Sequence, residues 1–268
     1  MITTKRKAWE NVIPHIVPDR AIKPRTVGLT MVIDRCQGLG DTADLLALTG
    51  DYVDQLKLSF GTSMLMDEGL LRRKIEIICQ SEIDVFPGGT LFEAAEFQGV
   101  FQPFLEQAVN LGFSAIEISD GTIDLPRAKR TEYIRRGLDA GLVVITEVGK
   151  KDPRAQLSAG QTIEQVAADL DAGADLVIIE AREGGKGIGV YDEGGNVRED
   201  MLDLLVSGLE GFLDSIMWEA PLKLQQAYLV ERFGSNVSLG NIKPRDVLGL
   251  ETLRCGLRWE TFRHHVGA

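Results

Sequence analysis

Charged and polar side chains follow nearly every short apolar run of this sequence, and they are the residues best suited to chemistry. Carboxylates, lysines and hydroxyls can bind anions, hold a hard metal ion or transfer protons. Any single one is equally well explained as a solvated rim charge or a salt bridge. Burying so many unpaired charges would be costly, so the whole set indicates a functional site. In chain order the set is Asp34; Lys57 and Ser59; Gly88, Gly89 and Thr90; Glu117, Ser119 and Asp120; Glu147, Lys150 and Lys151; Glu180, Arg182 and Glu183; Glu219; and Asn241.

Lysine or carboxylate must carry any proton transfer in this chain. The histidines, His15, His264 and His265, lie near the chain ends, away from every apolar run. No HExxH motif, EF-hand loop or cysteine cluster occurs in the sequence. A bound metal would therefore be a hard ion such as Mg²⁺, held by carboxylates. The candidate ligands are Asp34, Glu117, Glu147, Glu180 and Glu219.

Strand alternation selects among neighbouring side chains. Residues two apart on a strand face the same side, so Glu147 and Lys151 share a face if the strand stays extended. This favours Lys151 over Lys150 as the inward-facing lysine. The same spacing pairs Lys57 with Ser59, Glu117 with Ser119, and Glu180 with Arg182.

Two further segments could meet an anion. The segment 184–189, GGKGIG, includes Gly185 and Lys186, and its glycines allow backbone N–H groups to approach an anion closely. It matches neither the Walker nor the dinucleotide fingerprint, and a mobile lid explains it equally well. Arg254 and Arg258 are four residues apart and could face one anion, or form a charge pair at a helix end.

The elements that position these residues alternate along the chain. Eight alternations of strand and helix predict a single-domain (β/α)8 TIM barrel over 29–268, with an N-terminal extension over 1–28. A doubly wound sheet is the second interpretation, but no glycine fingerprint follows the first strand. Strands are expected at 30–34, 55–61, 83–89, 115–121, 142–149, 175–185, 215–221 and 236–242, and helices at 67–80, 91–112, 126–141, 162–173, 204–213, 222–234 and 244–257.

Composition limits the partners. The 268 residues carry a formal net charge of −11, which repels nucleic acid and anionic membrane surfaces. We expect a cytoplasmic protein, because the N-terminus lacks the apolar region of a signal peptide and the 3 cysteines form no disulfide framework. Trp9, Val12 and Ile13 could mediate contacts in a homo-oligomer or cover the end of the barrel.

Several longer strings of the sequence are familiar. They are PGGTLFE (87–93), LGFSAIEISDGTI (111–123), ITEVGKKDP (145–153), DLDAGADLVIIEAREGGKGIG (169–189), EAPLKLQQ (219–226) and LETLRCGLRWETF (250–262). They strongly resemble the phosphosulfolactate synthase family, which includes archaeal enzymes of coenzyme M biosynthesis and related bacterial and plant heat-stress-associated proteins. The resemblance runs from about Gly28 to Phe262.

The resemblance implies a carbon–sulfur lyase of the (β/α)8 class. Such an enzyme adds sulfite to phosphoenolpyruvate with Mg²⁺ and gives (R)-2-phospho-3-sulfolactate, through an enolate-like intermediate that a lysine protonates. By the match in ITEVGKKDP, Lys151 would deliver this proton, with Lys57 and Arg182 as anion partners. Glu147 and Glu180, with Asp34 and Glu117, would supply metal ligands. The remaining candidates for substrate binding are Ser59, Ser119, Lys150, Gly185, Lys186, Asn241, Arg254 and Arg258.

Some positions depart from the family's usual pattern. Asp34-Arg35-Cys36-Gln37-Gly38-Leu39 stands where Asp-Lys-Gly-Leu is usual. Lys57-Leu58-Ser59-Phe60-Gly61-Thr62 stands where Lys-Phe-Gly-Trp-Gly-Thr is usual, and Cys255 and Trp259 replace an arginine and a glycine. Two alternatives therefore stay open: an enzyme of this family that uses another nucleophile with a phosphorylated acid, and a non-catalytic interaction protein.

Overall fold

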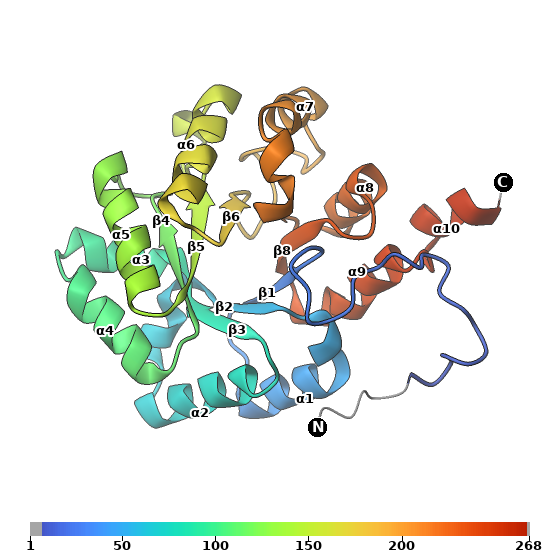
Figure 1. Ribbon diagram of the computed structural model, residues 1–268, viewed down its shortest axis with the longest axis horizontal. Helices are drawn as coiled ribbons and strands as arrows, with labels where there is room; N and C mark the ends of the chain where they lie inside the picture. The colour runs from blue at the N-terminus through green and yellow to red at the C-terminus, as the bar shows by residue number, and fades with distance from the viewer. Residues whose placement is uncertain (1–6, 267–268) are drawn as a thin grey trace.

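The apolar runs of the sequence form eight parallel strands in the order β3-β2-β1-β8-β7-β6-β5-β4. The computed structural model describes residues 7–266, and in it the helices lie around the outside of the sheet (Figure 1). Strands followed in turn by helices give a right-handed crossover each time, and the sheet curls into a nearly closed barrel. The prediction of a single-domain (β/α)8 barrel is confirmed.

The strands are short and sit inside the predicted ranges. They are β1 (Thr30–Asp34), β2 (Gln55–Leu58), β3 (Asp84–Pro87), β4 (Ala115–Ser119), β5 (Val143–Val148), β6 (Leu176–Ile179), β7 (Ile216–Glu219) and β8 (Ser238–Ile242). The helices are α1 (Leu39–Thr49), α2 (Glu68–Cys79), α3 (Gly89–Phe97), α4 (Phe101–Leu111), α5 (Arg127–Asp139), α6 (Ala159–Ala172), α7 (Glu199–Gly208), α8 (Lys223–Phe233), α9 (Val247–Arg254) and α10 (Trp259–Val266). None of these helices is long and apolar enough to cross a bilayer.

The helices differ from the prediction in three ways. Helices α1 and α10 were not predicted, one helix was expected over 91–112 where the structure has α3 and α4, and α7 lies at 199–208 where 204–213 was expected. The break falls at Gly99, whose φ of 70° lies in the left-handed region and ends the first helix. The chain then turns at Val100 and starts α4, so the two helices pack side by side on the barrel.

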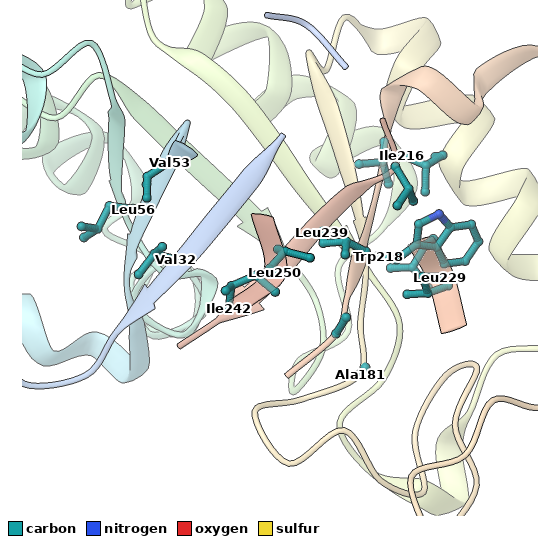
Figure 2. Close-up of a cluster of buried hydrophobic side chains, with 14 of the residues drawn as sticks. Val32, Val53, Leu56, Ala181, Ile216, Trp218, Leu229, Leu239, Ile242 and Leu250 are labelled. Atoms are coloured by element: carbon teal, nitrogen blue, oxygen red, sulfur yellow. The ribbon is translucent and has the colours of Figure 1, made fainter. Parts of the chain in front are cut away.

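Two apolar layers hold the barrel together. Figure 2 shows the layer between strands and helices, where Val32, Leu56 and Leu239 of the strands meet Leu229 and Leu250 of the helices. A second layer fills the barrel interior, and its buried members are Met31, Phe86, Ala115, Ile145, Leu176, Ile178 and Met217. This interior layer separates the two ends of the barrel.

The seam between β3 and β4 has no ladder pairing and is bridged by side chains. At its lower end, Ser114 donates from its backbone N–H to the Val85 carbonyl (3.2 Å) and accepts at its hydroxyl from the Val85 N–H (3.0 Å). At the carboxyl ends of the strands, the Gly89 N–H donates to the Glu117 carboxylate (2.8 Å). Glu117, one of the predicted site residues, thus helps to close the barrel.

The segment before β1 packs against the amino ends of the strands. Arg20 forms an ion pair with Glu251 of α9 (2.9 Å), and Arg25 pairs with Asp54 (2.9 Å). The described part of this extension, residues 7–28, contains only turns and irregular structure. Trp9, Val12 and Ile13 are exposed, so they do not cover the end of the barrel. Their role in oligomer contacts stays a prediction.

Arg130 of α5 ties a helix to the end of β5 and is almost completely buried. Its guanidinium donates to both carboxylate oxygens of Asp169 (2.7 to 3.0 Å), to Asp120 (3.0 Å) and to the Glu147 carbonyl (3.0 Å). Every part of the fork is therefore used, which is the geometry in which a buried arginine is stable.

Replacing this guanidinium should destabilise the fold. We expect Arg130→Met to lower the free energy of unfolding by about 3–5 kcal/mol, because Asp169 is left buried without its partner. The Arg130→Met/Asp169→Leu double variant should recover part of this loss. Urea unfolding monitored by circular dichroism measures both. A single variant as stable as the wild type would show that the pair contributes nothing.

Candidate active site

The carboxyl ends of the strands converge on Lys57, which projects from β2 into the barrel. Its ammonium lies 2.9 Å from Glu117 of β4, 2.8 Å from Glu147 of β5 and 3.7 Å from Glu219 of β7. All four side chains are buried. Burial lowers the pKa of Lys57, but the three carboxylates outweigh it, and the pKa lies well above its usual value. Lys57 is a fixed cation that joins four strands.

A second lysine enters the same group of acids from the loop after β5. The Lys151 ammonium lies 3.1 Å from Glu147, 3.6 Å from Glu180 and 3.6 Å from Glu93. Its side chain is 28% exposed, against 8% for Lys57, so it is the lysine that a solute can reach. Burial again lowers the pKa of Lys151, and the carboxylates again raise it further, which keeps Lys151 in the ammonium form.

We call these residues the lysine–carboxylate cluster. Its members are Lys57, Lys151, Glu93, Glu117, Glu147, Glu180 and Glu219.

Negative charge exceeds positive charge in the cluster, and protonation balances it unevenly. Burial raises the pKa of Glu117 to about 8, and burial together with the Glu147 charge raises the pKa of Glu180 well above its usual value. Burial acts in the same direction on Glu147, but Lys151 and Lys57 outweigh it and hold its pKa well below the usual range. Glu147, the carboxylate between the two lysines, is thus the one that stays ionised.

Close backbone approach at two glycines makes this cluster possible. A Cβ on Gly89 would lie 2.5 Å from the Glu117 carboxylate and from Ser119. Gly149 has a φ of 139°, and a Cβ there would lie 2.6 Å from the Cβ of Glu180. Any larger residue at either position would displace a cluster carboxylate.

Three cluster acids are arranged so that they could hold a metal ion. Ligand oxygens of Glu147, Glu180 and Glu219 all lie within 4.8 Å of one another, and all three residues are buried. One Glu180 oxygen is buried and has no hydrogen-bond partner among residues 7–266, and the Lys151 ammonium lies 3.6 Å from it. An excess of carboxylates and an orphaned oxygen fit a hard divalent cation such as Mg²⁺. The arrangement leaves Glu117 to bridge the seam and Lys57.

Glu93 is a member that sequence reasoning missed. It lies on α3, one turn after Gly89, and is buried. Its carboxylate is 2.8 Å from the Ser119 hydroxyl and accepts from the Thr122 N–H (3.1 Å). Because α3 begins directly after β3, an acid in its first turns points back to the strand ends. The string PGGTLFE contains this signal.

Comparison with known proteins identifies the family. The family model described as (2R)-phospho-3-sulfolactate synthase (ComA) matches residues 18–260. The chain belongs to the phosphosulfolactate synthase family. It is 45% identical over 237 residues to a phosphosulfolactate synthase of Methanocaldococcus jannaschii, covering 88% of this chain and 94% of the relative. It is 40% identical over 253 residues to that of Methanothermobacter thermautotrophicus, covering 94% and 97%.

A solved structure supports the fold alone. The 3-hexulose-6-phosphate synthase of Salmonella typhimurium superposes with a TM-score of 0.52 at 12% identity, covering 84% of this chain and 99% of that one. At this identity the likeness shows a shared barrel and carries nothing about substrate.

The departures from the usual family sequence fall in two places. Arg35 lies at the mouth of the barrel, where its guanidinium pairs with Glu183 of the loop after β6 (2.5 Å), and both side chains are about half exposed. Cys255 and Trp259 lie at the end of α9 and the start of α10, near the opposite end. The Arg35 loop and the segment after Lys57 therefore border the candidate active site, whereas Cys255 and Trp259 do not.

Two predicted ligands at the rim have structural partners. Asp34 forms an ion pair with Lys74 of α2 and accepts from the N–H groups of Cys36 (3.1 Å) and Gln37 (2.9 Å). The Ser59 hydroxyl donates to the Asp34 carbonyl (2.9 Å). Asp34 was expected as a metal ligand, but the structure places it at the end of β1, outside the group of three glutamates.

Lys150 and Ser119 also differ in their surroundings: Lys150 binds the loop after β4, whereas Ser119 lies in the lysine–carboxylate cluster. The Lys150 ammonium donates to the carbonyls of Asp120 (2.7 Å) and Ile123 (2.8 Å) and pairs with the Asp120 carboxylate (3.1 Å), so it secures the loop after β4. Ser119 lies inside the cluster, with its hydroxyl 3.0 Å from Glu147. Lys151, the lysine that alternation favoured, does lie beside Glu147, but β5 ends at Val148 and Lys151 reaches Glu147 from the loop.

The glycine segment after β6 folds on itself. The N–H of Gly185 donates to the Arg182 carbonyl (3.4 Å), that of Gly187 to Asp192 (2.8 Å) and that of Gly189 to Gln156 (3.0 Å). These three N–H groups are occupied, which leaves the exposed Lys186 and Arg182 as the cations of the segment. Arg182 has a φ of 59°, and its N–H donates to Glu180.

Asn241 of β8 combines backbone strain with an unused polar atom. Its φ of 55° lies in the left-handed region, which asparagine tolerates better than most residues. It is buried, and its side-chain oxygen has no hydrogen-bond partner within residues 7–266. Strain and an unpaired acceptor at a strand's carboxyl end suit a ligand-contacting residue.

Arg254 lies at the wrong end of the barrel for substrate binding. Its guanidinium donates to the Leu29 carbonyl (3.1 Å), the Val237 carbonyl (2.8 Å) and the Thr30 hydroxyl (2.5 Å), all at the amino ends of β1 and β8. Arg258 follows it and pairs with Glu260 (2.9 Å). Helix α9 runs antiparallel to the strands, so its C-terminal residues return to the side opposite the cluster.

The neighbouring cysteine offers a test of this placement. Burial and the nearby Glu251 carboxylate raise the pKa of the Cys255 thiol to about 11, whereas Cys36 is exposed at the mouth. At pH 8 iodoacetamide should therefore alkylate Cys36 well before Cys255, because the thiolate is the reactive form. Below pH 11 the Cys255 rate should rise about tenfold per pH unit. Peptide mass spectrometry over time measures both, with urea-unfolded protein as control. Equal rates in the native protein would contradict the placement.

Proposed function

We propose that this chain catalyses the addition of sulfite to phosphoenolpyruvate to form (R)-2-phospho-3-sulfolactate. Membership of the phosphosulfolactate synthase family supports it. The observation that carries the proposal is the partly exposed Lys151 ammonium, held 3.1 Å from an ionised Glu147 at the mouth of the barrel. A cation in this position suits a reaction of two anionic substrates.

The bond changes require one proton donor beside the reacting carbon. The sulfur lone pair of sulfite forms a bond to the methylene carbon of phosphoenolpyruvate. The electron pair of the carbon–carbon double bond moves to the neighbouring carbon and its carboxylate, giving an enolate-like anion. Lys151 gives its proton to that carbon, on one face only, and takes a proton back from solvent. General acid catalysis of this kind typically contributes about 10²–10⁴-fold.

The two lysines divide the work by their exposure. Lys57 contacts three carboxylates and holds the strand ends together, so it places a permanent positive charge inside the site. Lys151 reaches the cluster from a loop, and its side chain crosses Gly121, whose missing Cβ would lie 3.1 Å from it. A substrate that enters the mouth of the barrel must therefore contact Lys151 before Lys57. Asn241 and Arg182 are further polar groups at the carboxyl ends of the strands.

Mg²⁺ would be held by Glu147, Glu180 and Glu219. When bound, it would supply positive charge that stabilises the anion developing on the substrate carboxylate. The surplus of carboxylates over lysines in the cluster supports this assignment.

Removing the Lys151 ammonium should abolish most of the activity. We expect Lys151→Ala to lower kcat for phosphoenolpyruvate with sulfite and Mg²⁺ by about 10²–10⁴-fold, because the proton donor is lost. Phosphorus NMR follows substrate and product together. Lys129→Ala is the matched control. Lys129 lies on the outer surface of α5 and pairs with Glu96 of α3, so this variant should retain wild-type kcat.

Two results would count against this proposal. Full activity of Lys151→Ala would remove the assigned proton donor. Absence of a sulfite-dependent product from folded wild-type protein, with binding of phosphoenolpyruvate intact, would favour the alternative in which another nucleophile reacts.

The metal assignment predicts a binding defect that can be read without activity. Glu180→Gln should weaken Mn²⁺ binding, measured by the free-ion EPR signal, by at least about tenfold because a charged ligand is lost. Glu183→Gln removes one charge at the same mouth outside the cluster, and should bind Mn²⁺ like the wild type. Equal affinities of Glu180→Gln and wild type would place the metal elsewhere.

A further inference from the structure

A cavity lies at the amino ends of the strands, at the opposite end of the barrel from the lysine–carboxylate cluster. Its volume is about 690 Å³, within the usual range for small-molecule sites. Gln55, Asp84, Val143 and Leu176, which line it, are the first residues of β2, β3, β5 and β6. Leu176 also belongs to the apolar interior layer, which therefore forms the floor. The extension before β1 borders the cavity with Lys23 and Arg25.

Acidic side chains outnumber basic ones around this cavity. Two cations, Lys23 and Arg25, face a larger set of acids consisting of Asp54, Glu82, Asp84, Asp175 and Asp214. Of the acids, Asp54 is paired with Arg25. No lysine or arginine within residues 7–266 pairs with the other four. Burial raises the pKa of Asp84, and the charges of Asp175 and Asp54 add to this effect.

Most donors of the two cations bind acceptors of the fold. The Lys23 ammonium donates to the carbonyls of Gly50 (3.2 Å), Val53 (2.8 Å) and Ser81 (3.1 Å). Arg25 donates to Asp54 through its Nε–H and one Nη2–H, and to the Ala21 carbonyl through one Nη1–H, so one N–H on each Nη is left. The cavity therefore offers more unpaired carboxylates than cationic donors, which favours a cationic ligand over an anionic one.

Gln55 independently points to a ligand. It is only 5% exposed and lines the cavity, and its side-chain oxygen is buried without a hydrogen-bond partner. Its neighbour across the sheet, Asp84, uses one oxygen to accept from the Ser114 hydroxyl (2.9 Å) and keeps the other free. Asp175 likewise accepts from the Val144 N–H through one oxygen (2.8 Å). A buried, unpaired acceptor is costly unless something donates to it.

The spacing of the acids selects the shape of the donor. In residues 7–266, the group of three acids with oxygens within 4.8 Å of one another is the one at the other end of the barrel, so no three of the cavity acids lie close enough to ligate one small ion together. Mg²⁺ can also be held by one or two carboxylates with water, so its binding is one of the outcomes tested below. An elongated cation with separated N–H donors meets the acceptors better. We propose that this cavity is a second binding site, and that it takes an aliphatic diamine or polyamine whose ammonium groups pair with Asp84 and Asp175 and donate to Gln55.

The test titrates spermidine and putrescine into the full-length protein by isothermal calorimetry. We expect saturable 1:1 binding of at least one amine. The isosteric Asp84→Asn/Asp175→Asn variant keeps the hydrogen bonds to Ser114 and Val144 and should weaken this binding at least about tenfold. Gln55→Leu, which removes the acceptor at similar volume, should weaken it several-fold. Thermal unfolding of each variant without amine checks that it is folded.

Two controls separate this site from general attraction to an acidic protein. Asp44→Asn/Asp200→Asn changes the net charge equally at exposed positions on α1 and α7, and should bind the amines like the wild type. Glu180→Gln perturbs the lysine–carboxylate cluster and should also leave amine binding unchanged. No saturable binding, equal losses in the Asp44/Asp200 control, loss in Glu180→Gln alone, or binding of Mg²⁺ but not amines at Asp84 and Asp175 would each overturn the proposal.

Discussion

The site depends on one buried ammonium. Lys57 lies within 3.7 Å of carboxylates from β4, β5 and β7, so a single positive charge holds together the carboxyl ends of strands that are distant in sequence. Removing it would leave three acids facing one another in a medium of low dielectric constant, a situation that costs several kcal/mol. The barrel can therefore carry a dense acidic site only because this cation is fixed first. Glu117 adds a second duty, since it also bridges the seam between β3 and β4.

The same arrangement explains why there are two lysines. A cation enclosed by three carboxylates cannot approach a substrate, and Lys57 is nearly inaccessible. Lys151, carried by a loop, shares Glu147 with Lys57 but retains an open side. Chemistry and architecture are thereby assigned to different residues that share one carboxylate. At the other end of the barrel the cations have structural partners. Lys23, Arg25 and Arg254 bind backbone carbonyls and carboxylates of the fold.

Much of this was predictable from the sequence, and the failures have physical causes. All eight strands lie within their predicted ranges, because buried parallel strands are short apolar runs that end in polar residues. Lys151 lies beside Glu147 as predicted, although it does so from the loop after β5 and not from an extended strand. Helix α1 was missed since its apolar stripe is narrow, and the break at Gly99 depends on a left-handed backbone that local pattern does not reveal. Glu93 was missed because it reaches the cluster from a helix, while Arg254 was misplaced because the direction of α9 was not considered.

The central claim is that a lysine at the barrel mouth protonates the carbon that carries the phosphate after sulfite attacks the methylene carbon. Running the wild-type reaction in D₂O with phosphoenolpyruvate, sulfite and Mg²⁺, and examining the product by proton and carbon NMR, tests it most directly. We expect one deuterium on the phosphate-bearing carbon, with a single configuration, and none on the methylene carbon. Deuterium in the methylene group, a racemic product, or no sulfur-containing product would contradict it.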